Sequence, residues 1–436
     1  MQEKTKLLLI ILFSWIFFPL VAIATLYAYF ICWTFYLLYA RTDAPPSQSK
    51  VPFSPIRVYK VTLYLLNCLC EMVTAFIPSM LGYCWHSLSS KRKEILKKSS
   101  RYGPNKAKVD VYYSDRATLS PVIIFINTSL NTGKRGTCMP VAQNLQNQGY
   151  VVVVPDITLY PKGKIAEMVA DVQQCIYWTN SRIIQYGGDP SQIYLMGHSA
   201  GVLLSALTVI HDVCASLNVL PVNNSNVQIP IWDKKGTRLP RLQGLIFFSG
   251  IYDVTYYHAY LHHLGFEQIH SMPRVMGNTP ESLLQCSPSY LLNHALNNIR
   301  DRERLTKLLP KRVLLIHGAQ DTFNPPVSTK NFFHLLDSVG VPSVQLKIYE
   351  DIKYISPCKD LIIPNKRLCI LLSDDIKECC QNNNNPIIMN NYLNERRGGG
   401  KSEKEITKES DYRYPQKSEN NNYRNGKSRS GRSVRS

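Results

Sequence analysis

The chain has 436 residues, of which 45% are hydrophobic, and 50 Lys and Arg against 31 Asp and Glu give a net charge of +19. This apolar content excludes a wholly disordered chain, and 22 Gly and 12 Cys without a short period exclude collagen-like and disulfide-scaffold proteins. The length allows one large domain of roughly 250–300 residues with appendages, or two ordinary domains.

The first predicted element is a membrane helix over residues 7–39, which contain no charged residue. Thirty-three helical residues span roughly 50 Å, against a hydrocarbon core of about 30 Å. The helix therefore has to tilt, kink at Pro19 or extend into the interface, where residues such as Tyr27 and Trp33 are favoured. A signal peptide is the alternative, but its apolar run is usually roughly 7–15 residues long.

A second apolar stretch covers residues 61–85 and is interrupted by Asn67, Glu71 and Pro78. It indicates either a second span or a helix in the plane of the membrane, and the sequence leaves both open. A basic cluster follows it, so the positive-inside rule predicts a single- or double-pass protein whose main domain is cytosolic, for example at the endoplasmic reticulum. We therefore divide this part into a membrane-anchor region, 1–90, and a basic linker, 91–108.

The C-terminal segment, 381–436, is rich in Asn, Ser and Arg and poor in apolar residues, which predicts a disordered basic tail. Neither basic segment matches a zinc, homeodomain or RNA-recognition pattern, so we expect membrane lipid and no nucleic acid as partner. The scattered cysteines have no paired metal-ligand spacing, which indicates free thiols and no metal site.

Between these segments, residues 109–380 alternate between short apolar runs and helical periodicity. The pattern predicts a mainly parallel sheet covered on both faces by helices. The predicted strands are 109–113, 121–126, 150–154, 193–196, 245–248, 313–316 and 344–348, and the predicted helices are 165–186 and 202–213.

The most specific motif is Gly-His-Ser-Ala-Gly at residues 197–201, a G-x-S-x-G that follows the predicted strand 193–196 and precedes an apolar helix. This setting is the one that a nucleophile elbow requires, because the sharp turn displays the hydroxyl of Ser199 at the strand end. The motif therefore predicts a serine nucleophile.

Residues 187–201 resemble the elbow region of α/β-hydrolase esterases, and more closely the prenylcysteine (isoprenylcysteine) methylesterases, which are akin to hormone-sensitive-lipase-type carboxylesterases. The segments 156–164, 249–253, 287–288 and 317–321 are similar to that group as well. The resemblance covers about residues 121–350. It implies an α/β-hydrolase fold, joined here to N-terminal membrane helices, that acts on lipophilic or prenylated esters without a metal or organic cofactor.

The resemblance also assigns roles around Ser199. It places the acid of the catalytic triad at Asp321, with four residues between it and the end of the predicted strand 313–316. The triad histidine is expected after the last strand, but Tyr354 stands there and no His follows His334. A tyrosine with a pKa near 10 is a poor base at neutral pH. A substitute base from His258, His262 or His263 is the less favoured alternative.

The oxyanion site departs from the family as well. The family has glycines after its strand, whereas this chain has Thr128 and Ser129, and only the Ala200 N–H is expected to remain as a donor. The sequence therefore predicts a membrane-anchored serine carboxylesterase with weak activity. The alternative is a catalytically inactive relative, or pseudoenzyme, that binds an apolar ligand or a protein at the membrane. The substrate and the oligomeric state are not predicted.

Overall fold

The computed structural model describes residues 2–39, 52–78, 80–81, 84, 96–103, 107–114, 118–128, 130, 135–222, 227–229, 238–266, 269–350, 352–364 and 366–381. The tail predicted to be disordered, 381–436, lies outside the described residues except for Gln381, which ends the last helix.

An eight-stranded sheet forms the centre of the domain, in the order β1-β2-β4-β3-β5-β6-β7-β8. Strands β1, β2 and β4 pair antiparallel, and all pairs from β4 to β8 are parallel. The strands are β1 Leu96–Tyr102, β2 Ala107–Tyr113, β3 Ser120–Asn127, β4 Val151–Pro155, β5 Gly188–His198, β6 Gly244–Phe248, β7 Arg312–Gly318 and β8 Ser343–Tyr349.

Helices occupy both ends of the described chain and most connections between the strands. The α-helices are α1 Gln2–Tyr39, α2 Pro55–Glu71, α4 Met139–Asn147, α5 Ile165–Arg182, α6 Ala200–Ser216, α7 Val254–Leu264, α8 Met272–Val275, α9 Pro280–Gln285, α10 Pro288–Asn298, α11 Arg302–Leu308, α12 Pro326–Val339, α13 Pro357–Asp360 and α14 Arg367–Gln381. A π-helix, η1 Met72–Phe76, continues α2, and the 3₁₀ helices are η2 Arg135–Cys138 and η3 Ile183–Tyr186.

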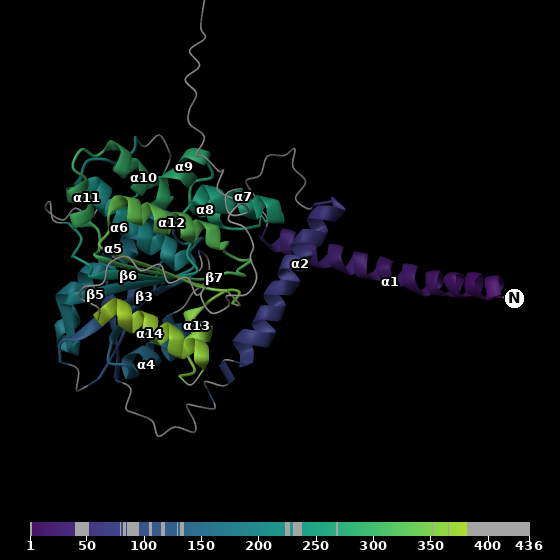
Figure 1. Ribbon diagram of the computed structural model, residues 1–436, viewed down its shortest axis with the longest axis horizontal. Helices are drawn as coiled ribbons and strands as arrows, with labels where there is room; N and C mark the ends of the chain where they lie inside the picture. Colours follow the sequence, from purple (N-terminus) through teal and green to yellow (C-terminus); the bar gives the residue numbers. More distant parts are fainter. Residues whose placement is uncertain are drawn as a thin grey trace, which may run out of the picture. The chain divides into compact units, whose positions relative to one another are not determined.

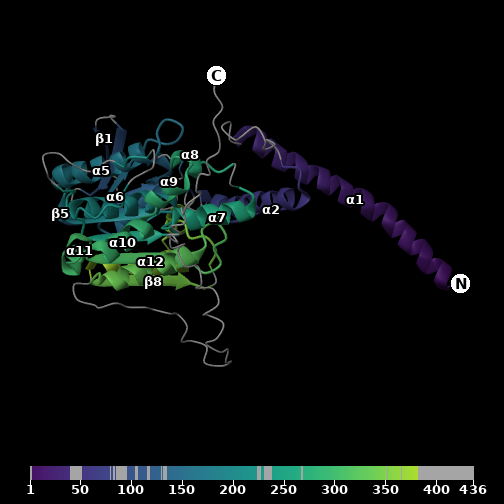
Figure 2. The ribbon, with the colours of Figure 1, turned by 90° about the horizontal axis from the view of Figure 1, so that it is seen from above.

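The sheet has a hydrophobic core on each face because successive strand residues point to opposite sides. In β3, Ile124 faces the core formed with α5, α6, α10 and α12, whereas Ile123 and Phe125 face the core formed with α4 and α14. Figure 1 shows these helices covering the two faces, and Figure 2 looks onto the face covered by α5, α6, α10 and α12. The continuous apolar runs of the strands are thus explained by burial on both sides, as expected for a mainly parallel sheet covered by helices.

The predicted strands fall within strands of the structure, except that the strand predicted over 150–154 begins one residue before β4, and the predicted helices correspond to α5 with η3 and to α6. The linker predicted over 91–108 is corrected in part, since residues 96–102 form the edge strand β1. Lys97 and Ser99 of this strand contact the buried Asp110 of β2, at 3.0 Å and 2.5 Å. Apolar runs do not predict this strand because its residues are mostly charged or polar, although charged residues are common on sheet edges.

The N-terminal helix α1 is the one helix among the described residues that is long and apolar enough to cross a membrane, over Trp15–Leu38. A signal sequence would pass the same test of length and composition. The next helix, α2, contacts both α1 and the α/β domain: Thr62 donates to the Ala28 carbonyl at 3.0 Å, and Tyr64 packs against Phe266 with ring centroids 4.5 Å apart.

Candidate active site

Ser199 stands between β5 and α6 at a sharp bend of the backbone. Its φ of 54° and ψ of −119° lie in a region that residues with a side chain seldom adopt. The bend is held by neighbouring elements, since the Ser199 N–H donates to the Phe248 carbonyl of β6 at 3.0 Å. This geometry matches the predicted nucleophile elbow.

Two glycines around Ser199 allow α6 to approach the sheet closely. A Cβ on Gly201 would overlap the carbonyl oxygen of Ile126 in β3, and a Cβ on Gly197 would lie 2.9 Å from the backbone of Val202. Both positions therefore need glycine for packing, whatever chemistry Ser199 performs.

Asp321 lies in the loop after β7, at the same carboxyl edge of the sheet as Ser199, and is almost fully buried. Its Oδ1 accepts the backbone N–H groups of Phe323 and Asn324 at 2.8 Å and 3.0 Å. Among the described residues, its Oδ2 has no hydrogen-bond partner. The Nε2 atom of His317 is 3.2 Å from Oδ2, but it donates to the Asn324 carbonyl at 2.7 Å instead. One buried carboxylate oxygen is thus left without a donor.

Tyr354, the residue at the expected histidine position, lies within hydrogen-bonding reach of Ser199. Burial is the main cause that raises the pKa of its hydroxyl above the ordinary value; Asp321 raises it further, and the contact with Ser199 opposes the shift. The ring packs against Phe323, with centroids 5.3 Å apart. A phenol with a raised pKa stays protonated at neutral pH and cannot take the proton of Ser199.

Asn324 is a site residue that the sequence reasoning missed. It is buried, and its side-chain Nδ2 donates to Ser199 Oγ at 3.1 Å and to the Ser249 carbonyl at 2.7 Å. An amide N–H donates but accepts no proton. Its place three residues after Asp321, before two prolines, was the available signal, but only the fold brings it to Ser199. Asn324 thus donates to the Ser199 hydroxyl, and Tyr354 lies beside it, so the described residues that contact the nucleophile present an amide donor and a phenol.

The histidines nearest the site are engaged elsewhere. His198 Nδ1 lies 2.8 Å from Asn127 Oδ1, and burial, with a smaller effect of Lys359, lowers its pKa to about 3. His317 Nδ1 lies 2.7 Å from Thr329 Oγ1. Both ring nitrogens of His317 are thus engaged, and the ring links the loop of Asp321 to Thr329 of α12. Neither imidazole contacts Ser199 Oγ by a hydrogen bond.

The predicted oxyanion residues are only partly described. The N–H of Ala200 belongs to the first turn of α6, where backbone donors have no partner within the helix. Thr128 follows β3 and is buried, and the register pairs the preceding Asn127 with His198, so Thr128 and Ser199 leave adjacent strand ends. Ser129 lies outside the described residues.

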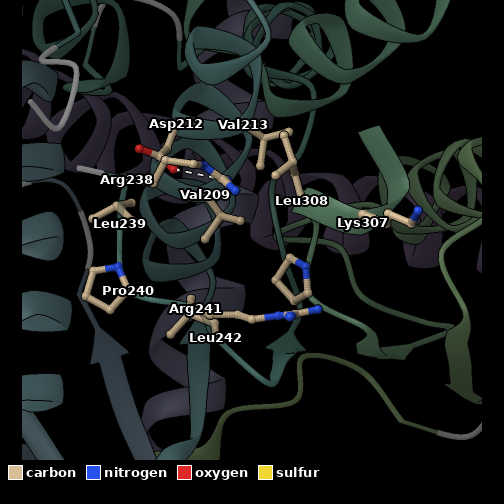
Figure 3. A pocket seen from close by; sticks show the side chains of 11 residues that line it. Val209, Asp212, Val213, Arg238, Leu239, Pro240, Arg241, Leu242, Lys307 and Leu308 are labelled. Carbon is tan, nitrogen blue, oxygen red and sulfur yellow. Dashed lines mark hydrogen bonds and ion pairs between the residues drawn. The ribbon is translucent and has the colours of Figure 1, made fainter. Parts of the chain in front are cut away.

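A cavity of about 190 Å³ lies at the other edge of the sheet. Figure 3 shows its lining from α6, from the segment that leads into β6 and from the end of α11, with Arg238 directed at Asp212 at 3.5 Å. Gly244 and Arg312 begin their strands on this side, whereas Ser199 and Asp321 follow strand ends. The cavity is therefore separate from the Ser199 site.

Comparison with known sequences points to esterases. A sequence model of the BD-FAE family matches residues 109–336, just over half of the chain. A probable isoprenylcysteine α-carbonyl methylesterase of Oryza sativa is 27% identical over 235 residues, covering 53% of this chain and 51% of that protein. The isoprenylcysteine α-carbonyl methylesterase of Arabidopsis thaliana is 24% identical, covering 66% and 61%. The chain thus spans about half the length of the curated relatives it matches.

Solved structures show the same fold. Esterase B from Lactobacillus rhamnosis matches with a TM-score of 0.53 and 14% identity, covering 74% of this chain and 94% of that one. Carboxyl esterase 2 from Tuber melanosporum matches with a TM-score of 0.50 and 16% identity, covering 66% and 87%. At these identities the likeness establishes the α/β-hydrolase fold alone.

Proposed function

The chain belongs to the BD-FAE family and is an α/β-hydrolase of the carboxylesterase type that resembles the isoprenylcysteine methylesterases. From this premise we propose that it binds lipophilic esters at Ser199 on a membrane surface and hydrolyses them only weakly. Ser199 is the proposed nucleophile. Asp321 and Tyr354 are the counterparts of the acid and the base, and the Ala200 N–H is the proposed oxyanion donor beside Thr128 and Ser129.

The observation that carries the proposal is the environment of the Ser199 hydroxyl. It meets an amide donor, Asn324 at 3.1 Å, and a protonated phenol, Tyr354, in place of an imidazole. A positioned general base typically contributes 10²–10⁴-fold to the rate, and one oxyanion donor about 10²–10³-fold. Without a base, and with side chains in place of oxyanion glycines, turnover is expected to be slow although the nucleophile is present.

The lipophilic substrate class is supported by the surroundings of the site and by the relatives. The rings of Tyr64, Phe323 and Tyr354 follow one another toward Ser199, with centroids 5.5 Å and 5.3 Å apart. The relatives named as isoprenylcysteine methylesterases act, by their names, on esters that carry a prenyl chain. The exposed apolar helix α1 supports attachment to a membrane, where such esters are found.

A second candidate is a pseudoenzyme that uses the same site to bind an apolar ligand without turnover. The side chain of Asp321 favours it. Among the described residues its Oδ2 accepts no hydrogen bond, and its close neighbour His317 has no hydrogen bond to Ser199. An acid that orients no base at the nucleophile has no catalytic task. The two candidates differ in one measurable property, the reactivity of Ser199.

We would measure that reactivity with a fluorophosphonate probe on the full chain in membranes, with Ser199→Ala as the matched control. The proposed function predicts slow labelling that the control lacks, and slow hydrolysis of short acyl and methyl esters. No labelling at saturating probe would favour the pseudoenzyme. Turnover as fast as that of an esterase with a complete triad would show that a base acts at Ser199 and would overturn the proposal.

A further inference from the structure

Helix α2 has a second apolar face that the α/β domain leaves exposed. The residues of this face recur at intervals of three and four, the spacing of one side of a helix. We call them the outer stripe: Ile56, Tyr59, Leu63, Leu66 and Cys70. The first four side chains are 70%, 62%, 47% and 42% exposed, in that order, and Cys70 is exposed as well. The π-helix η1 extends this apolar surface with Val73 and Phe76. No position of the stripe is charged, so water is an unfavourable neighbour for it.

The opposite face of α2 is fixed to the domain beside the candidate site. Val58 and Val61 are fully buried in the core that also contains α6 and α7. The Asn67 side chain donates to the Thr322 hydroxyl at 3.4 Å, one residue after Asp321. A helix packed in this way along a folded domain is not surrounded by lipid.

The neighbouring helix α1 indicates what covers the outer stripe. Four successive residues of α1, Trp15–Phe18, are exposed by 78%, 62%, 47% and 67%. Four consecutive residues point in every direction around a helix. A protein partner covers one side of a helix, whereas a lipid phase covers all sides. The exposed apolar part of α1 therefore fits a bilayer.

The same helix places that bilayer next to α2. Residues 28–36 of α1 pack on the domain, where the Ala28 carbonyl accepts from Thr62 of α2 and the Tyr36 hydroxyl donates to the Gly265 carbonyl at 2.7 Å. The lipid-exposed part of α1 thus ends where α2 begins to contact it. Tyr29 and Trp33 lie at this junction, and both are residue types that are favoured at the membrane interface. The Tyr29 hydroxyl donates to the Phe53 carbonyl and the Trp33 Nε1 donates to the Pro52 carbonyl.

We propose that α2 lies in the plane of the membrane, with its outer stripe in the lipid interface and its inner face against the loop of Asp321. Of the two possibilities that the sequence left open for residues 61–85, this is the in-plane one. Together with the proposed function, it gives an ester dissolved in the bilayer a route to Ser199 past Tyr64 and Phe323.

Photocrosslinking in the full chain tests the contact with lipid. We would place p-benzoylphenylalanine at Leu66, at Phe17 as a lipid-exposed reference, and at the exposed Lys330 of α12 as a water-exposed control, in vesicles of phosphatidylcholine and phosphatidylserine. A phospholipid adduct at Leu66 as well as at Phe17, but not at Lys330, is the expected result. An adduct of Leu66 with a second copy or another protein, or an adduct at Phe17 alone, would overturn the proposal.

A charge variant tests whether the outer stripe makes the contact. Leu63→Glu with Leu66→Glu should lower the lipid adduct from a photoreactive group at Tyr59 by roughly tenfold. Ile184→Glu, at a residue 63% exposed outside α2, should leave it unchanged. An unchanged adduct in the double variant would contradict the proposal. The readout does not need Ser199 to react, so failure of the proposed ester chemistry and failure of the lipid contact are told apart.

Discussion

The two sides of the candidate site differ in how strongly the fold dictates their residues. On the nucleophile side, the bend at Ser199 is built by hydrogen bonds to β6, and Gly201 is required by the approach of α6 to β3. On the base side, Tyr354 stands in the segment between β8 and α13, which belongs to neither element. Packing requires the residues of the nucleophile side even without catalysis, whereas only catalysis would require a histidine on the base side.

This comparison shows why an intact elbow is weak support for an intact enzyme. The glycines of G-x-S-x-G are needed for the packing of the helix on the sheet, so the motif indicates the fold. The base and its hydrogen bond to the acid belong to the chemistry, and among the described residues Asp321 Oδ2 accepts no hydrogen bond.

The largest effect should come from Gly201→Ala, because the new Cβ would overlap the backbone oxygen of Ile126. We expect the free energy of unfolding to fall by about 3 kcal/mol, measured by urea denaturation followed by circular dichroism. Gly136→Ala is the matched control, since a Cβ there meets no atom within 4 Å. Equal denaturation midpoints would show that the elbow is less tightly packed than the structure indicates.

The base side is tested by Tyr354→His. An imidazole there can donate to Asp321 Oδ2 and accept from Ser199, and we expect ester hydrolysis to rise by about 10²-fold, the lower end for a general base. Rates with a short acyl ester provide the measurement. Tyr354→Phe should give no rise, and Asp321→Asn should remove most of the gain of the histidine variant. If the histidine adds nothing, the loop of Thr128 limits the reaction instead.

The pH dependence of stability tests the packing of His198 in the elbow. Its folded-state pKa of about 3 is below the ordinary 6.5, so the unfolded chain binds the proton that the folded chain excludes. Stability should therefore fall as pH decreases below 6.5, by at most about 1.4 kcal/mol per pH unit from this group. His198→Gln should reduce this slope between pH 7 and pH 5. An unchanged slope would mean that His198 takes up a proton in the folded state.

The smallest effect concerns the strain at Ser199. Glycine adopts a φ of 54° freely, so Ser199→Gly should relieve about 1–3 kcal/mol of backbone strain and lose roughly 0.5–1 kcal/mol to chain entropy. Urea denaturation should therefore give Ser199→Gly an unfolding free energy about 1 kcal/mol higher than that of Ser199→Ala, the matched control that keeps the strain and loses the same hydroxyl contact with Asn324. Equal unfolding free energies of the two variants would refute the strain argument.

The sequence by itself determined the strands of the core, the elbow and the position of Asp321. These features are local: strands buried on both faces must be apolar along their whole length, as in residues 121–126, and a sharp strand-to-helix turn needs small residues at 197 and 201. The absence of an imidazole at position 354 was also readable, because it depends on the identity of one residue.

Only the tertiary structure decided which groups meet. Asn324 reaches Ser199 across 125 residues of sequence, and the basic strand β1 pairs with β2, where its Lys97 contacts the buried Asp110. The inner face of α2 rests on the loop of Asp321 through Asn67 and Thr322, 255 residues apart. Such contacts depend on how separate elements pack, and the periodicity and motifs of a single segment contain no information about them.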